Sequence, residues 1–286
     1  MLKNILKISL LGIFLISCSE SDEQIEDLVS VETPIVNNPD LESIGLKIFV
    51  DKQEGNILES FIFKLEQKNK STYFGDLAQH LDSLVFKISD YNGTKKIFEK
   101  LENGNTGTIQ FNHNFYFPGN YNASILGYKS GKITYKDDID LKISNQKDFL
   151  VTNWNNFSEN TPIGYFNALS KNSLVFHNRF ENSNPYISVT NSWDNINDYT
   201  TDQIKQMDRD FLYNYFVKFY SIPQYTEANT SNLKDIYTQN FKKSIKNDIP
   251  VSIWITAKNK IALMKEYSTT NSSQFYGYRI IAEPNN

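Results

Sequence analysis

The chain has 286 residues, a single cysteine and a formal net charge of −4, with 33 acidic against 29 basic residues. Only Arg179, Arg209 and Arg279 are arginines, so the arginine-rich basic surface typical of nucleic-acid binding is missing, and we exclude nucleic acid as a partner. One cysteine permits no internal disulfide, so we expect burial of apolar side chains to stabilise the fold.

The first 17 residues have the pattern of a secretory signal. Lys3 and Lys7 make the start positive, and the apolar stretch 8–16 is too short to cross a bilayer core of about 30 Å as a helix. The sequence LISC at 15–18 resembles the bacterial lipobox. The resemblance implies that residues 1–17 are a lipoprotein signal peptide, and that lipid on the Cys18 thiol anchors the mature chain in a membrane.

Residues 18–42 are acidic and contain two prolines, a composition that buries too little apolar surface to fold. We predict a disordered tether for this segment. Its start, SESDE at 19–23, resembles the acidic signal of surface-exposed lipoproteins of the Bacteroidota, and the arginine-poor composition is similar to that of the same group. The resemblance implies an outer-membrane lipoprotein on the cell surface, with a periplasm-facing position as the alternative.

Residues 43–148 contain short runs in which apolar and polar residues alternate, as in β-strands with one buried face. Asn92-Gly93 lies between two such runs and favours a tight hairpin, and a second turn is expected at 129–132. About seven short strands at regular spacing predict a β-sandwich. The alternating runs contain Ile48, Phe63, Phe86, Phe111, Ile125 and Leu141.

The segment FYFPGNYNASILGYKSGKITYKDDIDLKI, residues 115–143, resembles the last two strands of PKD-like and other immunoglobulin-like domains. In those domains a Pro-Gly-x-Tyr turn leads into a strand, a hairpin and a final strand. The resemblance implies an immunoglobulin-like (PKD-like) β-sandwich for residues 43–148. It implies nothing about function, because one fold carries many functions.

Regular alternation ends at the polar interval 144–148, and we place a domain boundary there, before a second domain at 149–286. We expect Thr201 to be the N-cap of a short helix and Ser231 the N-cap of another, while 211–220 is aromatic on both faces and leaves helix and strand open. Strands are expected at 186–190, 250–256, 260–268 and 275–283, the last three as an antiparallel meander. The second domain is therefore predicted to be α+β with an antiparallel sheet, and the whole chain mainly β.

The sequence contains no recognisable catalytic motif. Its three histidines are far apart, so no zinc-binding pattern is formed, and no nucleophile elbow G-x-S-x-G occurs. Asp137, Asp138 and Asp140 precede the last strand of the sandwich and are candidate calcium ligands, because Ca²⁺ prefers carboxylate oxygens. No other metal and no cofactor is indicated.

These patterns favour a non-catalytic binding or adhesion protein of the cell envelope, with a glycan or a protein as its partner. One alternative is a glycan or peptide hydrolase that uses carboxylates of residues 149–286. Another is an accessory subunit of an outer-membrane assembly, with exposed aromatic side chains against a partner protein. A pocket with converging carboxylates in the second domain would favour the hydrolase.

Overall fold

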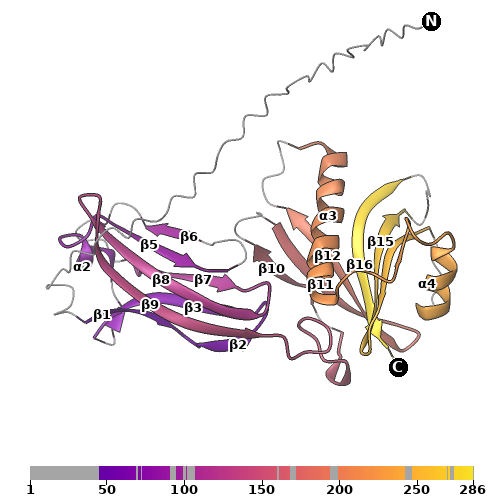
Figure 1. Cartoon of the computed structure of the whole chain (residues 1–286), viewed down its shortest axis with the longest axis horizontal. Helices are drawn as coiled ribbons and strands as arrows, with labels where there is room; N and C mark the ends of the chain where they lie inside the picture. The colour runs from indigo at the N-terminus through magenta and orange to yellow at the C-terminus, as the bar shows by residue number, and fades with distance from the viewer. Residues whose placement is uncertain are drawn as a thin grey trace, which may run out of the picture. The chain divides into compact units, whose positions relative to one another are not determined.

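The computed structural model describes residues 45–285, except 69, 72, 91–94, 99–100, 102–106, 160, 168–171, 194–198, 242–246, 269 and 271–273. The predicted signal peptide, the tether and Cys18 lie outside the described residues. As predicted, the chain is mainly β, with three sheets and two longer helices (Figure 1). Among the described residues, no helix combines the length and the apolar character needed to cross a membrane.

The first sheet of a β-sandwich is built around β3 (Ser60–Gln67). This strand pairs antiparallel with β1 (Leu46–Val50), β4 (Lys70–Ser71) and β7 (Gln110–Asn114). The side chains of β1 are alternately buried and exposed, as the alternation of apolar and polar residues predicts. A one-turn helix, α2 (Phe74–Leu77), follows β4 in the chain.

The second sheet has the order β2-β9-β8-β5-β6. Its strands are β2 (Glu54–Asn56), β9 (Lys132–Ser144), β8 (Gly119–Lys129), β5 (Ser83–Ile88) and β6 (Lys95–Phe98). All neighbours are antiparallel except β2 and β9, which are parallel. With β5, β8 and β9 in one sheet and β1, β3 and β7 in the other, the strand order is that of an immunoglobulin-like sandwich.

Two local features accompany this strand order. The Tyr121 hydroxyl donates to the Phe117 carbonyl at 2.7 Å, which is the tyrosine corner found at the start of the corresponding strand in immunoglobulin-like domains. The β8–β9 hairpin turns through Ser130 and Gly131 with φ of +50° and +75°, both positive as a type I′ turn requires. The hairpin predicted at 129–132 is confirmed, whereas the Asn92-Gly93 turn lies outside the described residues.

The core of the sandwich contains four buried phenylalanine side chains among more numerous leucine and isoleucine side chains. Phe61, Phe63, Phe86 and Phe115 are at most 1% exposed. Phe61 and Phe115 meet edge to face with ring centroids 5.2 Å apart, and Phe86 meets Phe111 in the same way at 5.1 Å. Such pairs contribute on the order of 1 kcal/mol each beyond the burial of their area, so these rings hold the two sheets together.

The second domain contains a seven-stranded sheet with the order β10-β11-β12-β16-β15-β14-β13. Its strands pair antiparallel throughout, and β14, β15 and β16 form the predicted meander. The bounds are β10 (Ile163–Asn167), β11 (Asn172–Glu181), β12 (Asn184–Trp193), β13 (Tyr225–Thr226), β14 (Ile249–Ile255), β15 (Asn259–Tyr267) and β16 (Phe275–Pro284).

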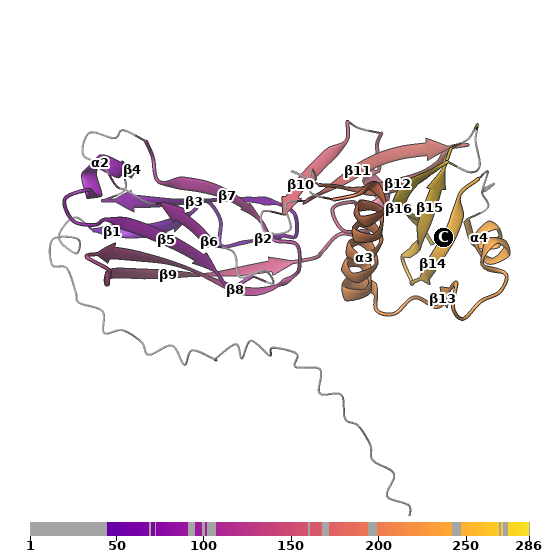
Figure 2. The ribbon, with the colours of Figure 1, turned by 90° about the horizontal axis from the view of Figure 1, so that it is seen from above.

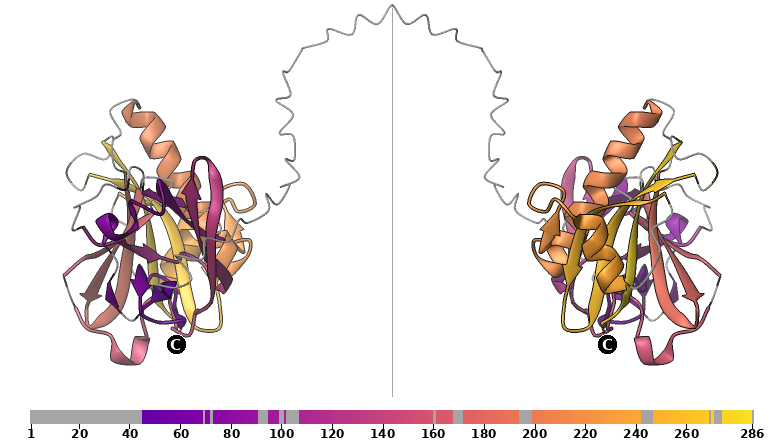
Figure 3. Two further views of the ribbon diagram at one scale, coloured as in Figure 1. Left: turned by 90° about the vertical axis from the view of Figure 1, so that its left-hand side faces the viewer. Right: turned by 90° about the vertical axis from the view of Figure 1, so that its right-hand side faces the viewer.

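Helices α3 (Thr201–Tyr220) and α4 (Leu233–Phe241) cover opposite faces of this sheet (Figure 2). The α3 side buries Ile261 and Ile280, whereas α4 packs on Ile253 and Ile281 of the other face. Figure 3 shows α3 beside the yellow strand β16, the strand with which it makes most of its contacts. Because both faces are covered there, β14 and the stretch 261–264 of β15 are nearly continuous apolar runs.

Helix α3 differs from the expectation in two ways. Its N-cap is Thr200 instead of Thr201, with a capping box in which the Thr200 side chain accepts from the Gln203 amide. It is also one helix of 20 residues that includes the ambiguous stretch 211–220. A helix fits there because its aromatic residues have contacts on more than one side. The ring centroids of Phe216 and Trp254 of the sheet are 6.4 Å apart, and those of Phe219 and Phe117 of the sandwich are 5.5 Å apart.

The sandwich and the second domain share a tight contact. Tyr116, which is 7% exposed, donates through its hydroxyl to the Tyr165 carbonyl, and its own carbonyl accepts from the Tyr215 hydroxyl at 3.2 Å. Phe117 stacks on Phe219 beside this pair. Buried residues of both parts belong to one continuous apolar cluster. The boundary between residues 148 and 149 stays a prediction, with a packed contact across it.

Candidate functional site

The connector between β9 and β10, residues 145–162, is folded against the protein for much of its length. Phe149 and Leu150 are fully buried, and Phe149 exchanges two backbone hydrogen bonds with Thr152, of 3.0 and 2.8 Å. Leu150 has φ of +46°, a value that a branched side chain adopts only when its surroundings impose it. A 3₁₀ turn, η1 (Trp154–Asn156), follows. The segment is a fixed piece of structure, on which side chains have defined places.

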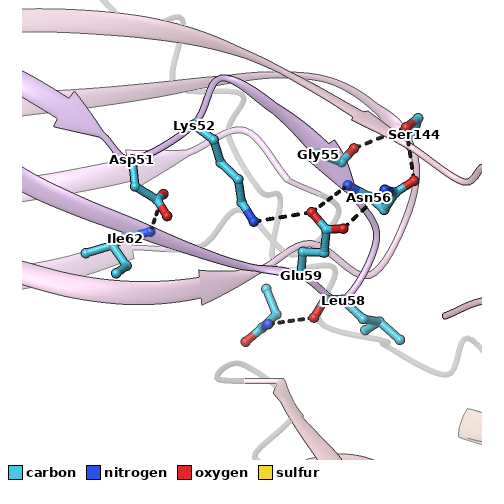
Figure 4. Close-up of polar contacts among 9 residues, drawn as sticks. Asp51, Lys52, Gly55, Asn56, Leu58, Glu59, Ile62 and Ser144 are labelled. Carbon is cyan, nitrogen blue, oxygen red and sulfur yellow. Dashed lines mark hydrogen bonds and ion pairs between the residues drawn. The ribbon is translucent and has the colours of Figure 1, made fainter.

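The start of the connector is held by the sandwich. Asn56 offers its side-chain oxygen to the Gln146 amide at 3.4 Å and to the Ser144 hydroxyl at 3.3 Å. Asn56 is itself held by Glu59, which accepts from the Asn56 amide and side chain, both at 3.1 Å, and from Lys52 at 3.2 Å (Figure 4). Burial alone would raise the pKa of Glu59, but these hydrogen bonds outweigh it and lower that pKa.

The turn that carries Glu59 is itself closely packed. A Cβ atom on Gly55 would lie 2.7 Å from the Phe61 ring and 2.9 Å from the Glu59 carboxylate, so only glycine fits. Leu58 has φ of +62°, and its carbonyl accepts from the Asn114 side chain at 2.9 Å (Figure 4). We conclude that this turn is a structural support for the connector, because its polar groups are already engaged with one another.

The other support of the connector comes from the large sheet. Asp148 accepts from the Trp154 amide at 3.0 Å and from the Lys258 ammonium at 2.9 Å. The buried Asn259 side chain donates to the Asp148 carbonyl and accepts from the Trp154 indole, both at 2.8 Å. The Lys258 hydrogen bond, with that of the Trp154 amide, lowers the pKa of Asp148, so its carboxylate stays charged in neutral solution.

A pocket of about 310 Å³ lies between the connector and strands β10 and β11. We call it the connector pocket. Three asparagine amides, two hydroxyl residues and one lysine line it together with four apolar or aromatic residues. They are Lys147, Val151, Thr152, Asn153, Asn156, Ser158, Ile163, Tyr165, Phe176 and Asn178. Its volume is at the lower end of the range for ligand pockets, about 300–1,000 Å³.

Most polar side chains of the connector pocket have no hydrogen-bond partner among the described residues. In the described part of the chain, the side chains of Lys147, Asn153 and Asn156 make no hydrogen bond or ion pair. Asn178 is the exception, because it donates to the Ser158 carbonyl at 3.0 Å and so closes one side of the pocket. These free donors and acceptors are available to a ligand.

One wall of the connector pocket is aromatic. The Tyr165 and Phe176 rings meet edge to face with centroids 5.5 Å apart. The backbone of Tyr165 is fixed by the hydroxyl of Tyr116. Burial, with the nearby negative charge of Glu59, raises the pKa of Tyr165, so its hydroxyl stays protonated and can donate. The pocket thus combines aromatic side chains with neutral hydrogen-bonding groups and one lysine.

The carboxylates of the second domain do not converge on this pocket, whose lining contains no Asp or Glu. Among the acids of the second domain, Glu283 of β16 is 5% exposed, and the half-buried Asp208 of α3 accepts from Asn191 at 2.8 Å and from the Trp193 indole at 2.5 Å. Burial raises the pKa of Asp208, and these two hydrogen bonds act in the opposite direction. Its partners in the described part of the chain include no second carboxylate and no histidine, so no acid–base pair is formed.

The three calcium candidates have separate partners. Asp137 accepts from the Ile48 amide at 2.8 Å, Asp138 pairs with Lys136 at 3.4 Å, and Asp140 accepts from the Asn122 side chain at 3.0 Å. Strand alternation directs Asp137 to the face of β9 opposite to the other two. Within the described ranges, no three His, Cys, Asp or Glu side chains gather to hold a metal ion. The geometry gives the calcium hypothesis no support.

A second hollow, of about 600 Å³, lies on the sandwich where β2, β8 and β9 run side by side. It is an open groove on a sheet face, and Asp140 is one of its lining residues. Its charged lining residues are two acids and one base, and the base, Lys142, stands in register with Glu54 and two residues along β9 from Asp140. We therefore regard the connector pocket as the better candidate site.

Sequence reasoning missed the connector pocket. Its residues come from segments 147–158, 163–165 and 176–178, and no motif joins them. The only signal was the polar stretch TNWNNFS at 152–158, in which amide and hydroxyl residues surround two aromatic ones without strand or helix periodicity. Comparison of the sequence with family models and with curated proteins produced no match.

Proposed function

We propose that the protein is an exported, lipid-anchored outer-membrane protein on the cell surface, and that its folded part is a non-catalytic binding module. The lipobox-like sequence before Cys18 and the acidic residues after it support the location. The observation that carries the binding role is the connector pocket, which is lined by Lys147, Asn153 and Asn156, whose side chains have no hydrogen bond or ion pair in the described part of the chain.

Free polar groups beside an aromatic wall are what a ligand site needs. Ligand pockets combine apolar and aromatic surface with a small number of polar groups that orient the ligand. The connector is anchored on both sides, by Asn56 and by Asn259, so these groups are held in place before a ligand arrives. Such preorganisation reduces the entropy that binding would otherwise cost.

The same lining argues for binding over hydrolysis. A glycosidase uses two carboxyl groups flanking the scissile bond, and a general acid or base must reach the reacting atom. The connector pocket offers neither carboxylate nor histidine, and Asp208 stands alone among amide and indole donors. A ligand would therefore be held unchanged.

The test uses a soluble form, residues 35–286, which begins with the compact unit and lacks Cys18. It is screened on glycan and peptide arrays, and each hit is measured by isothermal titration calorimetry. We expect Asn156→Ala, in the pocket lining, to weaken binding at least tenfold. The matched control is Asn155→Ala, since Asn155 is exposed and does not line the pocket. A ligand whose affinity is the same for both variants would place the binding site elsewhere.

A further inference from the structure

Lys147 is the one charged residue in the lining of the connector pocket. Each acid near this region already has a cation: Asp148 lies 2.9 Å from Lys258, and Glu59 lies 3.2 Å from Lys52. Glu159, next to the lining residue Ser158, lies 3.6 Å from Arg179. Lys147 itself has no ion pair in the described part of the chain. The pocket therefore has a positive charge without an internal counter-ion.

The backbone on both sides of Lys147 is fixed. The Gln146 amide is bound by Asn56, and Asp148 is bound by Lys258 and Asn259. Lys147 is also partly buried, so part of its side chain is covered by the protein. An ammonium group held at a pocket wall without a partner is an arrangement that an anionic ligand would complete.

We infer that the ligand of this pocket is an acidic saccharide, a sugar residue that carries one carboxylate. This rests on the binding function proposed above. The ammonium of Lys147 binds the carboxylate, and the amides of Asn153 and Asn156 bind the ring hydroxyls. The apolar face of the sugar ring lies against the half-buried ring of Tyr165, which packs edge to face on the buried Phe176.

The lining residues favour this ligand over a phosphate group and over a neutral sugar. A phosphate group is a dianion that is best held by bidentate arginine or by several donors, and no arginine lines the pocket. A neutral sugar would leave the Lys147 ammonium partly desolvated without a counter-charge. The volume of about 310 Å³ restricts the pocket to a small group, such as the end of a chain.

The main comparison in the experiment is between two ligands that differ only in the carboxylate. Residues 35–286 are titrated with an oligogalacturonate and with its methyl ester, which keeps every hydroxyl and removes the charge. A sulfated neutral oligosaccharide and a peptide with a free C-terminal carboxylate are the other two probes. We expect the acid to bind at least tenfold more tightly than the ester, the sulfated sugar and the peptide.

The variants locate this preference. Lys147→Gln is expected to remove it, so that acid and ester bind equally, while Lys132→Gln, at an exposed lysine of the β8–β9 hairpin, leaves it unchanged. The inference is wrong if the ester, the sulfated sugar or the peptide binds as tightly as the acid, if Lys147→Gln keeps the preference, or if no saccharide binds. The proposed function is tested separately. It holds after any of these results if the Asn156→Ala variant weakens the binding of at least one ligand of another class.

Discussion

The hydroxyl of Tyr116, in the corner between β7 and β8 of the sandwich, donates to the backbone carbonyl of Tyr165 in the edge strand β10. Tyr165 presents its side chain to the connector pocket. One hydrogen bond therefore joins the sandwich to the strand that forms the aromatic wall of the candidate site. The sandwich therefore supports that wall.

Replacing Tyr116 with phenylalanine removes only this hydroxyl. We expect the free energy of unfolding to fall by about 1–2 kcal/mol, because a buried carbonyl loses its partner. Urea unfolding of residues 35–286 measures the loss, and ligand titration should show weaker binding. Tyr276→Phe is the control, since Tyr276 is 54% exposed. Equal stability of the two variants would mean that the Tyr116 bond contributes little.

The support of the connector by Asp148 should depend on pH. The Lys258 bond lowers the pKa of Asp148 in the folded protein, so the unfolded state binds its proton more readily. The stabilisation is therefore present above the ordinary pKa of 3.8 and is lost as the pH falls through the lower folded value. Because Lys258 is 62% exposed, we expect Asp148→Asn to cost only about 1 kcal/mol at neutral pH.

The measurement is thermal unfolding of the wild-type protein and of Asp148→Asn between pH 7 and pH 3. The difference in stability should be largest at pH 7 and should shrink below pH 3.8. Asp138→Asn is the control, because its ion pair with Lys136 is exposed and supports no connector. A stability difference that stays constant across this pH range would show that the stabilisation does not depend on the charge of Asp148.

Lipid anchoring rests on Cys18. We expect Cys18→Ala to leave an uncleaved or released protein without lipid, since no other cysteine exists to receive it. Metabolic labelling with palmitate, followed by fractionation of membranes, measures this. Ser21→Ala should keep the label. Palmitate that persists in Cys18→Ala would overturn the lipoprotein assignment.

Surface display rests on the acidic residues that follow Cys18. Protease added to intact cells should digest the folded part, and replacing Glu20, Asp22 and Glu23 with alanine should protect it. The same replacement at Glu26, Asp27 and Glu32, further along the predicted tether, is the control and should leave the protein accessible. Full protection of the unmodified protein would place it on the periplasmic side.

The strands were predictable because their burial is simple. Alternation around Ile48 gives one buried face, and the apolar run from Ile249 to Ile255 fits a strand covered on both faces. Helix α3 was ambiguous from the sequence because Phe216 contacts the sheet while Phe219 contacts the sandwich, so the aromatic residues show no single stripe. Only the tertiary contacts explain that pattern.

The candidate site was less predictable than the fold. Asp137, Asp138 and Asp140 are neighbours in sequence, but strand alternation separates Asp137 from the other two, and each has its own partner. Lys147 and Tyr165 are distant in sequence, but they line one pocket because the connector folds back over β10. Zinc ligands occur at characteristic sequence spacings, whereas neutral amides in ligand pockets do not, so no sequence motif predicts such a site.

The last prediction concerns the boundary between residues 148 and 149. The sandwich has its own aromatic core, with Phe61 and Phe86 fully enclosed, and about 100 residues is a common domain size. The second domain has its own sheet with helices on both faces. We therefore expect fragments 43–148 and 149–286 each to fold and to melt cooperatively.

Each fragment should nevertheless melt at a lower temperature than residues 35–286. Cutting the chain exposes Tyr116 and Phe117 on one fragment and Tyr215 and Phe219 on the other, which lose their contacts across the boundary. Circular dichroism with thermal melting of the three proteins measures this, and Tyr116→Phe in the whole unit should move its melting temperature toward those of the fragments. If neither fragment melts cooperatively while the whole unit does, the two-domain prediction fails, because each side would then lack a sufficient core of its own.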